Sequence, residues 1–328
     1  MDTVRVGVIG VGALGRHHTR LYGECEGAEL VGIFDADPAA AERVASELGV
    51  CRFETEQALV DRIDGCSVAV PTDRHFEVVT RLLQQDRHVL VEKPIAASAG
   101  EGRRLVEMAE TGGRVLQVGH VERFNPVLEC LDHVPGSPRF IEAHRLAAYP
   151  PPRPDLHPRG TEVSVVLDLM IHDIDVVLSL VNSPVVSVDA VGVPVLSPTE
   201  DIANARLHFE NGCIANLTAS RVSQEQVRKI RVFKTDAYLS LDYGEKKGEV
   251  AYRDGNGISR EAAPTRDANA LLLELEDFCQ CIRQTEKRGR VVDPVVSGRN
   301  GLAALELAEQ ILESIARQAA AACRNTGE

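Results

Sequence analysis

The N-terminal third of the chain alternates short apolar runs with longer stretches in which apolar residues recur every three or four positions. The runs have the length of buried strands, and the longer stretches have the spacing of amphipathic helices. Strands that alternate with helices form a parallel sheet with helices on both faces. We therefore expect an α/β domain with a doubly wound parallel sheet over residues 1–122. Its expected strands are residues 4–9, 29–34, 66–70, 88–91 and 114–118, and its expected helices are 38–48, 76–85 and 99–110, with two more beginning near residues 13 and 56.

The pattern changes beyond about residue 122. A helix near residues 125–131, a strand at 139–147 and a proline-rich loop at 149–159 precede a long helix at 164–181. Short strands then follow one another with turn signals such as Glu210-Asn211-Gly212 between them, which indicates an antiparallel sheet. We expect a second α/β domain over residues 123–328. Its further strands are 185–193, 202–209, 213–220, 228–234, 237–242 and 249–253, and helices at 268–284 and 298–322 close the chain.

The composition excludes several classes of partner. The formal net charge is −13, from 36 Lys and Arg against 49 Asp and Glu, which disfavours nucleic acid and anionic membranes as partners. No run of about 18 apolar residues predicts a membrane span. The chain enters a strand at its start, which leaves no room for a secretory signal, so we expect a cytoplasmic protein. The eight cysteines are scattered without a CxxC pair, and we expect no metal site.

A glycine loop follows the first expected strand. Its sequence is Gly10-x-Gly12-x-x-Gly15, and a helix begins directly after it. Glycines allow the tight turn and the close approach of backbone to a pyrophosphate, and the helix N-terminus directs free N–H groups at the anion. Asp35 ends the second strand about 20 residues later, where its carboxylate can bind both ribose hydroxyls. No Arg or Lys lies between Gly32 and Glu42 to bind a 2′-phosphate, so this Rossmann pattern predicts NAD as the cofactor.

The carboxyl ends of the parallel strands are expected to surround one crevice, because ligands of such sheets bind there. The segments that follow the strands carry the polar residues of this domain. The expected cofactor-binding residues are Gly10, Gly12, Ala13, Leu14, Gly15, Asp35, Pro71, Thr72, His75, Glu92, Lys93 and Gln117.

The long helix at 164–181 is apolar almost all round, yet it carries a stripe of polar residues. At helical spacing the stripe contains Ser164, Asp168, His172, Asp175 and Ser179. Asp168 and His172 are four residues apart, so the carboxylate can orient the imidazole or raise its proton affinity. The stripe alone leaves open whether this pair is catalytic or a satisfied structural pair. Asp173 points roughly 140° away from Asp168, and we expect a structural contact there.

Lys93 stands at the carboxyl end of a parallel strand. Pro94 follows it and holds it in an extended conformation. An ammonium in this place lies close to the expected nicotinamide and can take part in proton exchange. The alternative is an ordinary surface lysine.

Three of these motifs together resemble a known family. Gly10-x-Gly12-x-x-Gly15, Glu92-Lys93-Pro94 and Asp168-x-x-x-His172 occur in the order and spacing of the Gfo/Idh/MocA oxidoreductases. The resemblance implies a Rossmann domain joined to an α/β domain with an open, mainly antiparallel sheet. It also implies a tightly held nicotinamide and a catalytic group made of Lys93, Asp168 and His172. Members of the family are commonly dimers or tetramers that pair through the outer face of that sheet, so we expect a homo-oligomer.

Two stretches are similar to a narrower group of that family. Residues 119–126, GHVERFNP, and 165–175, VVLDLMIHDID, resemble the UDP-N-acetylglucosamine 3-dehydrogenases, which make a 3-keto sugar nucleotide on the way to a 3-amino sugar for lipid A. This resemblance implies a UDP-sugar substrate whose phosphates need local cations, for which Arg145 is a further candidate. The expected substrate-binding residues are Lys93, His120, Arg123, Phe124, Asn125, Arg153, Arg159, Asp168 and His172. The alternatives are a dehydrogenase of a free polyol such as an inositol and a dinucleotide-sensing protein without catalysis.

Overall fold

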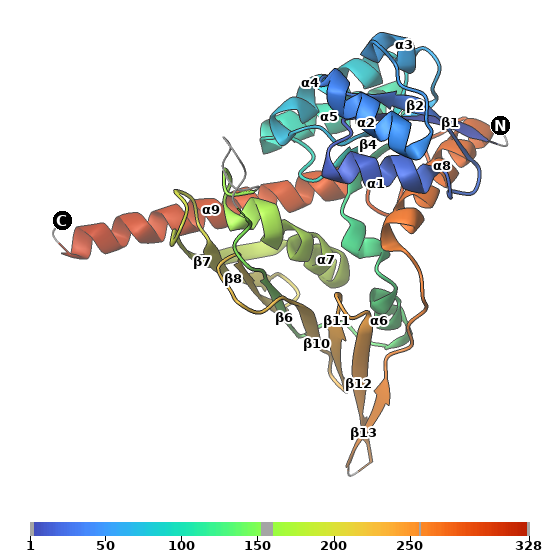
Figure 1. Cartoon of the computed structure of the whole chain (residues 1–328). Coiled ribbons are helices and arrows are strands. Elements are labelled where there is room, and N and C mark those ends of the chain that lie inside the picture. The colour runs from blue at the N-terminus through green and yellow to red at the C-terminus, as the bar shows by residue number, and fades with distance from the viewer. Residues whose placement is uncertain (1–2, 152–159, 256, 327–328) are drawn as a thin grey trace. The chain divides into compact units, whose positions relative to one another are not determined.

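The computed structural model describes residues 3–151, 160–255 and 257–326. The chain forms two compact units (Figure 1). The first contains Met1–Phe124 and Asn269–Ala303, and the second contains Asn125–Ala268 and Ala304–Glu328. Within the parts that the structure describes, no helix combines the length and the apolar character that crossing a membrane requires.

The first unit is built on a parallel sheet of five strands in the order β2-β1-β3-β4-β5. The chain places β2 on one side of β1 and β3 on the other, so the strand order reverses at β1, where ligands of such sheets bind. This confirms the predicted doubly wound sheet. The strands are β1 Val4–Ile9, β2 Ala28–Phe34, β3 Gly65–Val68, β4 His88–Glu92 and β5 Leu116–Gly119, and the helices between them are α1 Ala13–Tyr22, α2 Pro38–Leu48, α3 Glu56–Val60, α4 Thr72–Gln84 and α5 Ala99–Gly112.

Local sequence determines the ends of several of these helices. At the start of α2 the Asp37 side chain accepts a hydrogen bond of 2.9 Å from the Ala39 N–H, and Pro38 occupies the first helical position. The helix ends at Gly49, whose φ of +68° is in the left-handed region. The predicted helix at 38–48 therefore agrees with the observed one at both ends.

Helix α8, Ala270–Arg288, belongs to the first unit. Its buried face joins the same apolar cluster as strand β1, and Gly65 of β3 lies so close to it that a Cβ there would be 2.8 Å from Ile282 Cδ1. The first unit thus includes residues from the C-terminal part of the chain, whereas the expected division is a single boundary between residues 122 and 123. The amphipathic pattern of α8 predicts a buried face but does not specify which sheet covers it.

The second unit contains an eight-stranded sheet in the order β13-β12-β11-β10-β6-β9-β8-β7. Only β6 and β9 pair in parallel, and every other neighbouring pair is antiparallel, which confirms the predicted, mainly antiparallel sheet. Strand β13 was not predicted, because its residues are all exposed and form no apolar alternation. The strands are β6 Phe140–Leu146, β7 Val185–Val193, β8 Ile202–Phe209, β9 Ile214–Ser220, β10 Val227–Phe233, β11 Ala237–Asp242, β12 Lys247–Asp254 and β13 Gly257–Ala262.

Two helices of this unit bury their apolar residues against the sheet. They are α7, Ile171–Val181, and the part of α9, Gly298–Thr326, that begins at Ala304. Ile174 of α7 and Ile311 of α9 share one apolar cluster with Leu217 of β9. The predicted helix near 125–131 is observed as short turns, and most of the predicted proline-rich loop lies outside the described residues. The turns are η1 Val121–Phe124, which falls in the first unit, η2 Pro126–Glu129 and α6 Cys130–His133.

The packing of α8 generates a stability prediction. Phe278 of α8 is completely buried in the cluster that includes β1. We expect Phe278→Ala to lower the free energy of unfolding by about 3–5 kcal/mol, because the substitution removes buried apolar surface and leaves a cavity. Urea-induced unfolding measures this change. As a control, Ile258→Ala on exposed β13 should change stability by less than about 0.5 kcal/mol. Equal effects of the two substitutions would contradict the packing.

Candidate active site

The three glycines of the loop between β1 and α1 have different physical roles. Gly10 has φ of +85°, and a Cβ there would be 2.7 Å from the Ala69 carbonyl oxygen. A Cβ on Gly15 would be 1.8 Å from the Gly10 carbonyl oxygen, so α1 packs directly on the loop. A Cβ on Gly12 would meet no atom within 4 Å. Gly12 directly precedes α1, whose first residues, Ala13 and Leu14, have free backbone N–H groups. The open space beside Gly12 therefore fits a pyrophosphate.

Asp35 is held beside this loop. Its Oδ2 accepts a hydrogen bond of 2.7 Å from the Val11 N–H, and its Oδ1 accepts one of 2.8 Å from the Asp37 N–H. The carboxylate therefore stands at the end of β2, next to the loop that can hold the pyrophosphate. That position fits the ribose hydroxyls of NAD, whereas a 2′-phosphate would meet a negative charge.

His75, in the first turn of α4 after Pro71 and Thr72, joins two strand ends. Its Nδ1 lies 2.8 Å from the Pro94 carbonyl oxygen and its Nε2 lies 3.0 Å from the Val70 carbonyl oxygen. Burial lowers the pKa of His75, while these carbonyls and the charges of Glu92 and Asp73 act in the opposite direction. Both ring nitrogens face backbone, so the observed contacts of His75 hold the segment that carries Lys93.

Glu92 forms a buried pair with His18, which sequence analysis did not include in the site. Glu92 Oε1 lies 2.9 Å from His18 Nε2. Burial raises the pKa of Glu92, but the bond to His18 and the charges of His18, Lys93 and His75 outweigh it, and the pKa is lowered. An ionised carboxylate therefore stands beside Lys93. Helical spacing could have identified His18, because it lies on the buried stripe of α1 with Gly15.

Strand β5 and the segment after it contribute further polar residues to the first unit. Gln117 is buried and its Nε2 donates a hydrogen bond of 3.0 Å to the Glu274 carbonyl oxygen. Burial and the positive charges of Lys93 and Arg123 lower the pKa of His120 to about 3, so its imidazole is neutral near pH 7. Arg123 Nη2 donates a hydrogen bond of 3.3 Å to the Val295 carbonyl oxygen. Half-buried Phe124 follows.

Asp168 of the second unit lies in a π-helical turn, Val166–Met170, that precedes α7. The predicted long helix thus contains one turn in which the Ile171 N–H bonds to the Val166 carbonyl oxygen, five residues back. Such turns occur frequently at functional sites. Asp168 and His172 are both half-buried, whereas Asp175 is buried and Ser179 is exposed. The predicted stripe is therefore not uniform in burial.

Asp173 makes the structural contact that its position predicted. Arg145 Nε donates to Asp173 Oδ2 at 2.9 Å and Arg145 Nη2 donates to Asp173 Oδ1 at 3.1 Å. The Arg145 guanidinium also lies 5.7 Å from the centre of the Tyr243 ring. Asn125 accepts the Val127 N–H at 3.3 Å and donates to the Tyr243 carbonyl oxygen at 3.2 Å. These contacts give Arg145 and Asn125 supporting roles in the second unit.

Two of the predicted arginines, Arg153 and Arg159, lie outside the described residues. Across residues 3–151, 160–255 and 257–326, no group of three or more His, Cys, Asp and Glu side chains could hold a metal ion.

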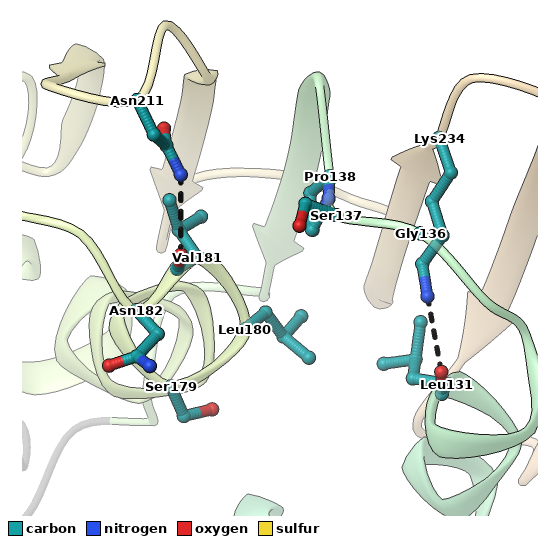
Figure 2. A pocket seen from close by; sticks show the side chains of 10 residues that line it. All are labelled: Leu131, Gly136, Ser137, Pro138, Ser179, Leu180, Val181, Asn182, Asn211 and Lys234. Atoms are coloured by element: carbon teal, nitrogen blue, oxygen red, sulfur yellow. Dashed lines mark hydrogen bonds between the residues drawn. The ribbon is translucent and has the colours of Figure 1, made fainter.

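A pocket in the second unit lies at the carboxyl end of α7 (Figure 2). Asn211 Nδ2 donates to the Val181 carbonyl oxygen at 3.4 Å, and Lys234 Nζ donates to the Leu131 carbonyl oxygen at 3.2 Å. Asn182, which ends α7, is ten residues beyond His172, or roughly 15 Å along a helix. None of the predicted site residues lines this pocket. Its lining residues are Leu131, Gly136, Ser137, Pro138, Ser179, Leu180, Val181, Asn182, Asn211 and Lys234.

Known proteins resemble both parts of this chain. Residues 4–120 match the oxidoreductase family with an NAD-binding Rossmann fold, and residues 132–240 match the GFO/IDH/MocA C-terminal domain. The chain is 37% identical over 289 residues to the UDP-N-acetylglucosamine 3-dehydrogenase of Acidithiobacillus ferrooxidans, which covers 86% of this chain and 90% of that protein. A solved structure of the enzyme with that name from this organism superimposes with a TM-score of 0.88 at 35% identity, covering 96% of this chain and 98% of that one.

A second relative acts on a different kind of molecule. The inositol 2-dehydrogenase of Rhizobium meliloti is 27% identical over 333 residues, which covers 96% of this chain and 98% of that protein. The matches extend over both units, and the glycine loop and Asp35 fit the cofactor that the N-terminal match names. The chain therefore belongs to the Gfo/Idh/MocA oxidoreductases and is an NAD-dependent dehydrogenase of that family.

Proposed function

We propose that this dehydrogenase oxidises the C3 hydroxyl of UDP-N-acetylglucosamine to the 3-keto sugar nucleotide. The observation that carries the proposal is the 37% identity to a UDP-N-acetylglucosamine 3-dehydrogenase over 86% of the chain. The identity to an inositol 2-dehydrogenase over a comparable length is lower, at 27%. The product would supply an aminotransferase that makes a 3-amino sugar for lipid A or a surface polysaccharide.

The proposed mechanism divides the work among three side chains. Bound NAD supplies the acceptor for the hydride that leaves C3. His172 accepts the hydroxyl proton as general base, and Asp168 orients its imidazole. Lys93 donates a hydrogen bond to the reacting oxygen and is the alternative acceptor of that proton. These groups must come within about 3 Å of the hydroxyl during the reaction.

A substrate with two phosphates needs local positive charge in a protein whose net charge is −13. Arg123 and Lys93 both lie near enough to His120 for their charges to lower the pKa of its imidazole. We propose that Arg123 binds the pyrophosphate together with Arg153 and Arg159, with Phe124, Asn125 and His120 completing the substrate site.

We also propose that the protein assembles through the outer face of the eight-stranded sheet. Val193 pairs with Ile202 and Val191 pairs with Asn204 across β7 and β8, so these side chains point to one side. The three apolar ones are between 36% and 52% exposed, which is costly on a surface that stays in water. Light scattering measures the mass in solution, and a monomer would contradict this proposal.

The first prediction of this function concerns cofactor choice. We expect the protein to bind NAD in preference to NADP, because Asp35 opposes a 2′-phosphate. Asp35→Ser should weaken NAD binding and reduce the preference, since it removes both the ribose contact and the negative charge. Calorimetry with both cofactors measures the two affinities. Similar affinities of the wild-type protein for NAD and NADP would contradict the assignment of Asp35.

The second prediction concerns the reacting groups. His172→Asn and Lys93→Ala should each lower kcat by about 10²-fold or more, because each removes acid–base assistance. NAD affinity should change little in His172→Asn. The exposed residues Lys229 and Lys247 on the second sheet offer controls, and their replacement by Ala should leave kcat unchanged. If the His172 or the Lys93 variant keeps normal turnover, the replaced residue has no part in the mechanism.

The third prediction concerns the substrate. Free N-acetylglucosamine should have a kcat/KM at least ~100-fold below that of UDP-N-acetylglucosamine, because the binding energy of the nucleotide is missing. Steady-state kinetics with both compounds and with an inositol makes the comparison, and mass spectrometry detects the 3-keto product where NADH accumulation is too small to see. If the free sugar or the inositol matches the nucleotide sugar, the enzyme is a polyol or sugar dehydrogenase. If nothing turns over while NAD binds, a dinucleotide-sensing role is favoured.

A further inference from the structure

Arg221 directly follows β9 in the second unit, and its guanidinium donates hydrogen bonds only to groups of the protein in the described contacts. The side chain is buried, and each of its three nitrogens donates to an acceptor. An arginine has five N–H donors, and the number of observed acceptors equals that number. The donations run from Nε to Asp201 Oδ1 at 2.8 Å, from Nη1 to the carbonyl oxygens of Gly160 at 2.6 Å and Val163 at 2.8 Å, and from Nη2 to Ser197 Oγ at 2.9 Å and Thr199 Oγ1 at 2.8 Å.

Asp201 completes this cluster, and it is fully buried. Its Oδ2 accepts backbone N–H groups at 2.8 Å from Val195, 2.5 Å from Leu196 and 2.9 Å from Ser197. Burial raises the pKa of Asp201, but the bonds from Ser197, Leu196 and Arg221 lower it far more, so its pKa lies well below the usual range. The pair therefore stays ionised at neutral pH. A buried pair is stable only when its remaining hydrogen bonds are also satisfied, and here they are.

The carbonyls that Arg221 holds belong to the turn that leads to Asp168. Gly160 and Val163 precede the π-helical turn, and the Val165 N–H donates to the Glu200 carbonyl oxygen at 2.9 Å, beside Asp201. Gly160 has φ of +83°, and a Cβ on it would be 2.5 Å from Asp168 Oδ2 and 3.1 Å from Asp168 Cγ. The bare Cα of Gly160 therefore forms the surface on which the Asp168 carboxylate rests.

We propose that Gly160 and the Arg221–Asp201 pair are positioning residues that set the place of the Asp168 carboxylate, and through it the orientation of His172. The inference rests on the proposed catalytic role of Asp168 and His172. Arg221 fixes the Gly160 carbonyl, Gly160 limits how far the carboxylate can move, and the carboxylate directs the imidazole. The cluster acts on the reaction through this chain of contacts and not by touching the substrate.

Gly160→Ala tests the last link directly. The added methyl group meets the Asp168 carboxylate, so we expect kcat for UDP-N-acetylglucosamine to fall at least ~10-fold and its pH profile to shift, as a small displacement of an acid–base group costs about that much. KM should change less than kcat. Gly212→Ala is a matched control, because Gly212 has φ of +82° and its Cβ would meet no atom within 4 Å. Both substitutions place alanine at nearly the same positive φ, so the fall in Tm of Gly212→Ala measures the backbone strain, and any further effect in Gly160→Ala comes from the contact with Asp168.

Arg221→Lys tests the first link. A lysine keeps the charge but has only three donors at one atom, so it cannot hold Asp201, Gly160 and Ser197 together. We expect a smaller fall in kcat than in Gly160→Ala, with the same direction of shift in the pH profile. Arg206→Lys, at an exposed position of β8 where the arginine donates a hydrogen bond of 3.2 Å to Asn216 Oδ1, should leave both quantities unchanged.

A readout without turnover separates this inference from the proposed function. The ¹³C chemical shift of the Asp168 carboxyl carbon, assigned with Asp168→Asn, should change in Gly160→Ala and in Arg221→Lys but not in Gly212→Ala. If the wild-type protein does not oxidise UDP-N-acetylglucosamine, the proposed substrate is wrong, and the chemical shift still tests the positioning. If Gly160→Ala and Gly212→Ala give the same Asp168 carboxyl shift and the same kcat, the inference is overturned. Loss of folding in Arg221→Lys would leave the decision to these two glycine variants.

Discussion

An ionised side chain can be buried only where an opposite charge and hydrogen bonds replace the water it loses, and this constraint shapes the supports of both units. Among the described residues, three buried contacts show how such groups are paired. His18 contacts Glu92 beside Lys93, Arg145 binds Asp173 next to His172, and Arg221 binds Asp201 behind the turn that carries Asp168. Each pair therefore supports the segment that carries a residue to which the proposed mechanism assigns chemistry.

This arrangement separates support from reaction. Asp168, His172 and Lys93, to which the proposed mechanism assigns chemistry, are only half-buried, whereas the supporting side chains are buried almost completely. Removing one partner of a buried pair leaves an uncompensated charge, so such positions tolerate substitution poorly. A catalytic side chain on a fixed support keeps its geometry while it exchanges a proton, which is what acid–base catalysis requires.

The cofactor and the substrate depend on different kinds of contact. Binding of NAD needs backbone that comes close to a pyrophosphate and one carboxylate for the ribose, and the geometry of the glycine loop and Asp35 fits both requirements. The proposed sugar nucleotide would instead be bound by side chains from loops, for which we propose Arg123 and the arginines of the proline-rich stretch. Family membership follows from the first kind of contact together with the matched domains, while the choice between a nucleotide sugar and an inositol depends on the second.

The amino-acid sequence by itself determined the strand and helix alternation, the glycine loop, Asp35 and the Lys93, Asp168 and His172 motifs, because each depends on residues close together in the chain. Helix α2 illustrates this, since Asp37, Pro38 and Gly49 define both of its ends. The tertiary structure alone decided that α8 packs on the parallel sheet and that the helix before α7 widens into a π-helical turn. It also decided that His18 pairs with Glu92 and that Arg221 holds Gly160. Apart from the π-helical turn, these features join residues that lie far apart in the chain, 61 positions for Arg221 and Gly160 and 74 for His18 and Glu92. Local pattern carries no information on which distant group satisfies a buried charge or covers an apolar face.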